Sequence, residues 1–216
     1  PPTMLLPLLP FGLLPAPIAM ALWVLGTSAL LTLVLHRLFQ DWRMVLAVVL
    51  SPAAWYCISF AQNGALTAAL LVAGLWTADR RPVIAGICFG LLTIKPQLGI
   101  LLPFALVAGR HWRAFVTAAG VASGVLALTV LLFGADAWAG FLHRTMPAMT
   151  AQLLHDYGIP PQHAMPTMLV TLQGWGAGTS LAGFGQALSA LAAIGAVTWA
   201  WRHRGADSNW RNALTC

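Results

Sequence analysis

The sequence contains no glutamate, and only five of its 216 residues are acidic. Charged residues of both signs make up 7% of the chain, whereas an ordinary soluble domain has roughly 25%. So few charges cannot cover the surface of a water-soluble protein of this size. The composition therefore excludes a soluble enzyme, a soluble nucleic-acid-binding domain and a disordered tail.

Cysteine is also scarce. Cys57 and Cys88 lie inside apolar segments, and Cys216 is the last residue. There is no Cys-x-x-Cys pair and no spacing typical of a metal site, so the sequence predicts neither a disulfide framework nor a zinc site. We expect no metal and no cofactor.

Apolar residues dominate instead, with 59% of the chain hydrophobic and a mean hydropathy of +0.80. We expect an all-α, polytopic bundle of transmembrane helices that forms one integral-membrane domain over residues 1–216. About seven crossings are predicted, at residues 17–35, 44–60, 64–77, 82–94, 98–108, 114–133 and 181–201. The first, sixth and seventh runs reach the roughly 20 residues that a full crossing needs.

The runs on either side of Lys95 are shorter, about 20 Å each at the helical rise. Their meeting point is therefore expected to lie below the membrane surface, lined by protein and water. Residues 3–14 are apolar but contain Pro7 and Pro10, which leaves two alternatives. They form either a broken helix entering from the outer face or a full crossing.

Residues 134–180 are too long for a simple connector and predict a helical extracytoplasmic loop. Apolar residues at helical spacing indicate a surface helix over 137–155 with Asp136 as its N-cap. A second short helix is expected over 165–172. Because the chain opens on Pro1 without an initiator Met, we interpret it as a chain that begins in mid-protein.

The net charge of +6 comes from basic residues clustered between apolar runs, in every second connection. This placement predicts cytoplasmic connections at 36–43, 79–81, 110–113 and 202–211, and it argues against a nucleic-acid partner. The intervening connections, 62–63, 95–97 and 134–180, are then expected to face outward.

Lys95 is the only lysine in the chain. An ionisable group at membrane depth indicates a function, and a compact ammonium suits a phosphate; the alternative is a lysine that snorkels from a helix end. Gln62, Asn63 and Gln97 could bind sugar hydroxyls or phosphate oxygens, although Asn63 followed by Gly64 is also typical of an ordinary turn.

The long outer loop adds ionisable residues. His155, Asp156 and His163 are weak candidates for a general base that takes a proton from a hydroxyl. Their spacing fits no metal motif.

Several segments together are similar to glycosyltransferase family 87. They are the opening Pro1-Pro2-Thr3, the run Gln62-Asn63-Gly64 with the residues up to 70, residues 81–86, the break Ile94-Lys95-Pro96-Gln97 with the two residues after it, and the stretches 109–114 and 133–138. The Lys-Pro-Gln break is the most specific part. Ala61 departs from the family pattern, which usually has glycine before Gln-Asn.

The resemblance implies a GT-C-type enzyme without a cofactor. Such an enzyme takes a hexose, typically mannose, from a polyprenyl-phosphate carrier and passes it to a lipid or glycan acceptor. Its active site would open on the extracytoplasmic face of a bacterial-type inner membrane. The resemblance also implies a first helix and a first outer loop upstream of Pro1, with the catalytic aspartate in that loop. A polytopic transporter or lipid flippase is the alternative function, and a membrane scaffold is a third.

Overall fold

The computed structural model describes residues 1–155, 167–203, 212 and 215, and all regular elements in this part are helical. The all-α prediction is therefore confirmed. The elements up to the fifth α-helix are η1 (Pro2–Met4), α1 (Leu5–Leu8), η2 (Leu9–Phe11), α2 (Ala16–Phe39), α3 (Trp42–Val49), α4 (Pro52–Ser59) and α5 (Gly64–Thr77). The remaining elements are α6 (Pro82–Leu91), η3 (Leu92–Ile94), η4 (Pro96–Gly99), α7 (Leu102–Ala108), α8 (Trp112–Phe133), α9 (Ala135–Gly140), the π-helical turn η5 (Phe141–Thr145), α10 (Met146–His155), α12 (Met168–Gly174) and α13 (Thr179–Arg202).

Three of the described helices, α2, α8 and α13, are long and apolar enough to cross a membrane. They correspond to the three runs for which the sequence predicted full length. The bent pair α3 and α4 passes the same test only if it counts as one span. About seven crossings are not confirmed, because α5, α6 and α7 contain only 14, 10 and 7 residues.

Two helix breaks have a local cause in proline. The predicted run 44–60 is bent by 51° between α3 and α4, since the residue before Pro52 cannot continue an α-helix. Ser51 caps the new helix, and its hydroxyl accepts a hydrogen bond from the Ala54 amide at 3.2 Å. At the N-terminus, η1, α1 and η2 together span only Pro2–Phe11, which favours the broken helix over a full crossing.

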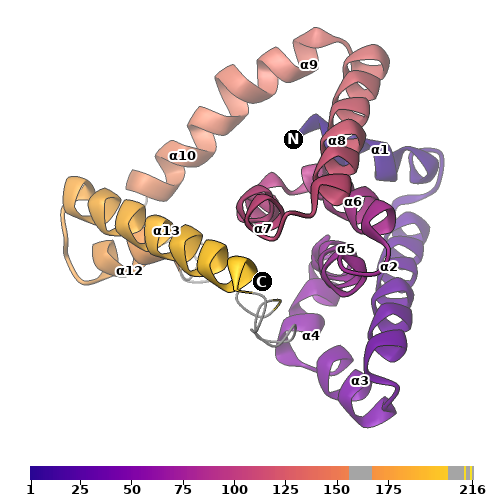
Figure 1. Ribbon diagram of the computed structural model, residues 1–216. Coiled ribbons are helices and arrows are strands. Elements are labelled where there is room, and N and C mark those ends of the chain that lie inside the picture. The colour runs from indigo at the N-terminus through magenta and orange to yellow at the C-terminus, as the bar shows by residue number, and fades with distance from the viewer. Residues whose placement is uncertain (156–166, 204–211, 213–214, 216) are drawn as a thin grey trace.

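The buried core is built from α5, α6, η3, α7, α8 and α13. Within it α6 and α8 approach closely and run in the same direction (Figure 1). A Cβ at Gly86 would lie 2.6 Å from the Ala114 carbonyl, and one at Gly90 would lie 2.8 Å from the Ala118 carbonyl. Glycines four residues apart allow such backbone contact between membrane helices.

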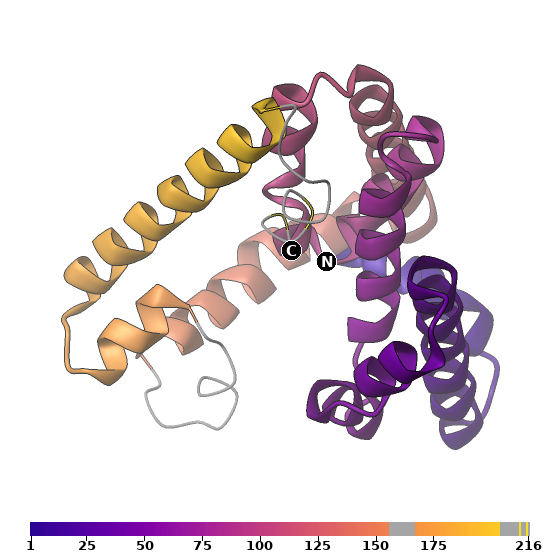
Figure 2. The same cartoon turned by 60° about the horizontal axis from the view of Figure 1, so that its bottom comes forward.

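The elements after α8 extend away from this core. Figures 1 and 2 show α9, η5 and α10 as one rod that leaves the end of α8, and α13 returning toward α7. The Leu169 amide on α12 donates to Oε1 of Gln186 on α13 at 3.1 Å. The predicted N-cap at Asp136 is wrong: Gly134, with φ of 79°, is the N-cap, because its backbone turns the chain at the end of α8, and Asp136 lies in the first turn without a capping bond.

The α4 C-terminus ends in a Schellman turn whose left-handed residue is Ala61, with φ of 46°. The Gln62 amide donates to the Cys57 carbonyl at 2.8 Å, and the Ala61 amide donates to the Ile58 carbonyl at 3.2 Å. Glycine is the usual residue at this position, because a Cβ is unfavourable there.

Replacing Gly90 by alanine is expected to separate α6 from α8. Because the added methyl would overlap α8, the free energy of unfolding should fall by about 1–3 kcal/mol, the usual cost of overpacking. Thermal unfolding in detergent measures this. Gly120→Ala is the matched control, since its Cβ meets no atom within 4 Å; an equal loss for both variants would contradict the proposed contact.

Ala61→Gly is expected to stabilise the protein by about 0.5–1 kcal/mol, because relief of the left-handed strain outweighs the greater freedom of the unfolded chain. Ala65→Gly, inside α5, should instead destabilise it by about 1 kcal/mol. Both changes are measured as shifts of the melting temperature, and a fall for Ala61→Gly would show that the turn is not strained.

Candidate active site

Lys95 lies between two 3₁₀ turns, η3 and η4, at the point where the chain reverses from α6 to α7. Pro96 follows it and opens η4, so Lys95 lies outside the helical conformation, with φ of −142° and ψ of 73°. The turn is closed by two backbone bonds, in which the Lys95 amide donates to the Leu92 carbonyl at 2.8 Å and the Leu98 amide donates to the Lys95 carbonyl at 3.0 Å. The Lys95 side chain is half-buried.

The packing of α6 on α8 sets the depth of Lys95. Beyond the contact between Gly90 and Val121, α6 and η3 continue for four residues, while α8 continues for twelve residues to Phe133. At the helical rise, this difference of eight residues corresponds to about 12 Å. Lys95 therefore lies beside the middle of a membrane-length helix, well short of its end.

The N-terminal segment packs on this break. Thr3 is 2% exposed, and its hydroxyl donates to the Thr93 carbonyl, two residues before Lys95, at 2.8 Å. The Thr93 hydroxyl is itself buried and has no hydrogen-bond partner within the described residues. The break thus joins Pro1-Pro2-Thr3 to the Lys-Pro-Gln segment and contains one buried hydroxyl without a hydrogen-bond partner among the described residues.

Asn63, in the connection between α4 and α5, also contacts the N-terminal segment. Its Nδ2 lies 3.5 Å from the Met4 sulfur, while its backbone carbonyl accepts from the Thr67 amide at 3.0 Å in the first turn of α5. Asn63 therefore contacts the residue next to Thr3, although the described structure shows no direct contact between Asn63 and Lys95.

The two predicted binding glutamines, Gln62 and Gln97, lie in different parts of the structure. Gln62 is exposed and lines a separate cavity of about 250 Å³ between α2, α4 and α5, with Thr27 and Ser51 among its other walls. Gln97 is exposed in η4, and no contact joins it to Lys95 in the described part of the chain. Of the predicted binding residues, only Asn63 and Lys95 are thus brought to one cluster, through the N-terminal segment.

An apolar cavity of about 350 Å³ adjoins the break, enclosed by α6, α7 and α8. Thr93 and Pro96 line it on either side of Lys95, and Phe89, Ile100 and Phe115 supply much of its apolar wall. Lys95 itself is not among the residues that line the cavity, which therefore lies beside the break and not around the lysine.

The outer-loop candidates are only partly described. The backbone of His155 ends α10, whereas Asp156 and His163 lie outside the described residues. Among the described residues, no three His, Cys, Asp or Glu side chains group in a way that could hold a metal ion.

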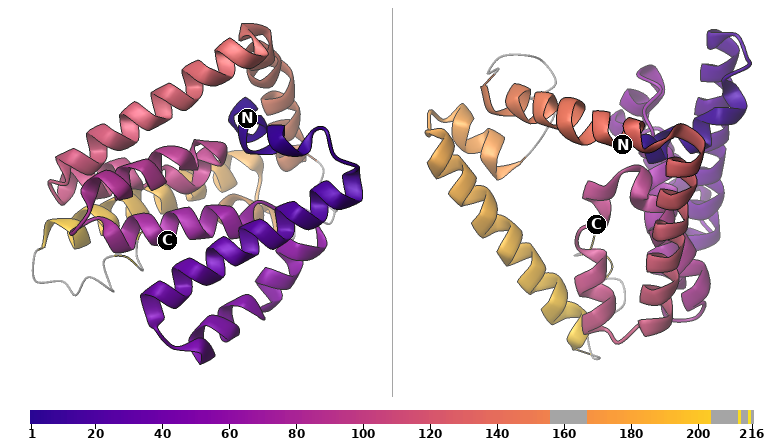
Figure 3. Two further views of the ribbon diagram at one scale, coloured as in Figure 1. Left: turned by 90° about the vertical axis from the view of Figure 1, so that its right-hand side faces the viewer. Right: turned by 90° about the horizontal axis from the view of Figure 1, so that it is seen from above.

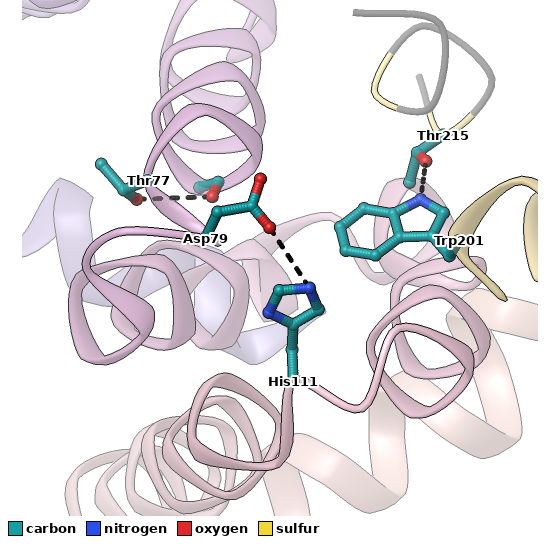
Figure 4. A network of polar contacts seen from close by, with 6 residues as sticks. Thr77, Asp79, His111, Trp201 and Thr215 are labelled. Carbon is teal, nitrogen blue, oxygen red and sulfur yellow. Dashed lines mark hydrogen bonds and ion pairs between the residues drawn. The ribbon is translucent and has the colours of Figure 1, made fainter. Parts of the chain in front are cut away.

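A second polar cluster lies at the other end of α6 and α8 (Figure 4). Nε2 of His111 is 3.4 Å from an Asp79 carboxylate oxygen, and the His111 ring stands edge-on to Trp201 with centroids 5.4 Å apart. The Trp201 indole donates to the Thr215 hydroxyl at 2.8 Å. No sequence motif predicts this cluster, because its members come from three distant connections.

Thr93 and Met4 also belong to the Lys95 cluster, and no sequence motif predicts either of them. Pro1-Pro2-Thr3 was a signal for the N-terminal contact, but nothing in the sequence paired it with residues 90 positions away.

A family model described as glycosyltransferase family 87 matches residues 1–216. No curated protein and no solved structure matches the chain. A match to a family of membrane enzymes is consistent with the apolar helices that are long enough to cross a membrane. From this match, the chain belongs to glycosyltransferase family 87 and is a membrane glycosyltransferase.

Proposed function

We propose that the protein transfers a hexose, most simply mannose, from a polyprenyl phosphate to a hydroxyl of a lipid or glycan acceptor. The observation that carries the proposal is the Lys95 break, which the N-terminal segment binds through Thr3. A lysine beside the middle of a long apolar helix is costly to keep in a membrane. Binding of a phosphate would offset this cost.

In the proposed reaction, the acceptor oxygen forms a bond to the anomeric carbon while the bond from that carbon to the phosphate oxygen breaks. The leaving polyprenyl phosphate keeps the electron pair, and the acceptor proton passes to a base. Negative charge thus builds on the phosphate as the bond breaks, and a fixed cation stabilises this charge most in the transition state.

We assign Lys95 to this leaving phosphate. Its ammonium supplies the charge, and the Thr93 hydroxyl, which has no partner in the described structure, supplies a neutral donor to a second oxygen. The cavity between α6, α7 and α8 then receives the first isoprene units of the carrier, since its wall is apolar.

The sugar and acceptor side is proposed from the remaining polar residues. Asn63, Gln62 and Gln97 are assigned to hydroxyl groups, with Asn63 nearest to the N-terminal segment. For the base, we propose the upstream aspartate that the family resemblance implies, with His155, Asp156 and His163 as weaker candidates.

Charge supports an extracytoplasmic active face. The connections containing Arg80, Arg81 and Arg110 lie at the Asp79–His111 end of the bundle, whereas Lys95 follows the opposite end of α6. Basic connections stay on the cytoplasmic side of membranes, so we propose that Lys95 is reached from outside, in the inner membrane of a bacterial-type cell. Membership of a glycosyltransferase family argues against the transporter and the flippase.

Lys95→Met removes the charge and keeps an apolar stem of similar length, so the fold should survive. Transfer should fall by about 10²-fold or more, the usual scale for loss of one preorganised stabilising group. The loss should appear in kcat more than in the KM for the acceptor, because the charge develops in the transition state. Sugar transfer from a synthetic polyprenyl-phosphate donor to an acceptor measures both constants.

Two further variants control this experiment. Lys95→Arg should restore transfer only in part, because a planar guanidinium replaces a compact ammonium poorly in a tight site. Arg37→Gln removes a positive charge from the far end of α2 and should leave transfer unchanged. Transfer by Lys95→Met at the unmodified rate would make Lys95 a snorkelling helix end.

The proposed orientation predicts which positions an impermeant thiol reagent reaches in intact cells. In a background without native cysteines, Gln62→Cys and Thr150→Cys should be labelled from outside. Arg37→Cys, Arg80→Cys and Arg110→Cys should be protected until the membrane is opened. Labelling of position 80 in intact cells would reverse the orientation and the proposed face of the active site.

A further inference from the structure

A large groove lies at the Asp79–His111 end of the bundle, between α7, the start of α8 and the end of α13. Its volume is about 1060 Å³, and it adjoins the cavity beside Lys95, with which it shares Pro103 and Phe115 in its lining. Phe104, Val107 and Phe115 form part of an apolar wall, while Arg110 and Arg202 supply two cations. Figure 3 (right) shows α13 meeting α7 only near its C-terminal end and diverging from it elsewhere.

The two guanidinium groups are not neutralised by the described residues. Arg110 and Arg202 are both exposed, and neither forms an ion pair within the described part of the chain. The nearby carboxylate of Asp79 instead lies beside His111. The rim of the groove therefore combines two cations with Trp112, an aromatic residue of the kind that favours membrane interfaces.

The backbone of Arg110 sets where this side chain begins. The α7 C-terminus ends in a Schellman turn, in which the His111 amide donates to the Leu106 carbonyl at 2.8 Å and the Arg110 amide donates to the Val107 carbonyl at 3.1 Å. Arg110 occupies its left-handed position with φ of 58°, where glycine is usual. Arginine at this position bears the cost of a Cβ in the left-handed region, as Ala61 does in the α4 turn.

The second cation is held next to the first by packing. A Cβ at Gly109 would lie 2.8 Å from the Trp201 ring and 2.7 Å from the His111 ring, so the α7 turn and the end of α13 fit closely together. Trp201 is 3% exposed, and Arg202 follows it directly. The fold therefore fixes both arginines at one groove.

We propose that this groove binds an anionic phospholipid. Its phosphate lies between Arg110 and Arg202, since each guanidinium can donate to two phosphate oxygens. One acyl chain lies along Phe104, Val107 and Phe115. A basic pocket between membrane helices is the type of site that binds anionic headgroups. The site lies at the opposite end of α6 from Lys95, and the proposal does not depend on the proposed transfer reaction.

Native mass spectrometry of the whole protein in detergent tests the site, with phosphatidylglycerol and phosphatidylcholine of identical acyl chains as probes. The unmodified protein should retain phosphatidylglycerol in preference to phosphatidylcholine. Arg110→Gly and Arg202→Gln should each weaken phosphatidylglycerol retention about fivefold, the effect of one basic residue near an anionic headgroup. Arg110→Gly should also leave the melting temperature unchanged or raise it, because glycine relieves the turn.

Arg37→Gln is the matched control, since Arg37 is an exposed arginine at a helix C-terminus outside the groove. Its phosphatidylglycerol retention should equal that of the unmodified protein. Unchanged retention in both groove variants, or an equal loss in Arg37→Gln, would overturn the site. Displacement of the lipid by millimolar inorganic phosphate would also overturn it, because the groove would then bind free phosphate and not a lipid.

Discussion

The close contact of α6 with α8 at Gly86 and Gly90 determines where the other elements of the bundle lie. Two helices that are close in sequence and run in the same direction need a segment that returns between them, and η4 with α7 is that segment. The return brings the α7 turn against Trp201 and so positions α13. It also requires the chain to reverse at Lys95, because α6 ends before α8 does. One glycine-mediated contact thus determines the position of the apolar cavity, the lysine and the basic groove.

Much of the helical arrangement could be predicted from hydropathy, because apolar runs and basic connections are local signals. The positions of α2, α8 and α13 follow from run length, although α2 ends at Phe39, four residues beyond the predicted run 17–35. The bend at Ser51 and Pro52 and the cap at Gly134 were not predicted, because both depend on backbone geometry. A composition that is apolar throughout can identify a membrane helix but cannot show where it bends.

The candidate site was predicted less completely than the fold. Lys95 and Asn63 stood out as polar residues between apolar runs, and the structure connects them through Met4 and Thr3. Gln62 stood beside Asn63 in the sequence, yet it lines a different cavity, between α2, α4 and α5. The two arginines of the basic groove are 92 positions apart, and only tertiary packing could bring them together.

The buried Thr93 hydroxyl has a consequence for how ligand binding and folding are coupled. A buried donor without a partner costs about 1–3 kcal/mol, and the described structure provides no partner for it. A ligand that places an oxygen at this hydroxyl recovers that cost as well as its own contacts. Any ligand bound at η3 would therefore add to the stability of the whole bundle by mass action, so that its binding and the folding of the surrounding helices would be coupled.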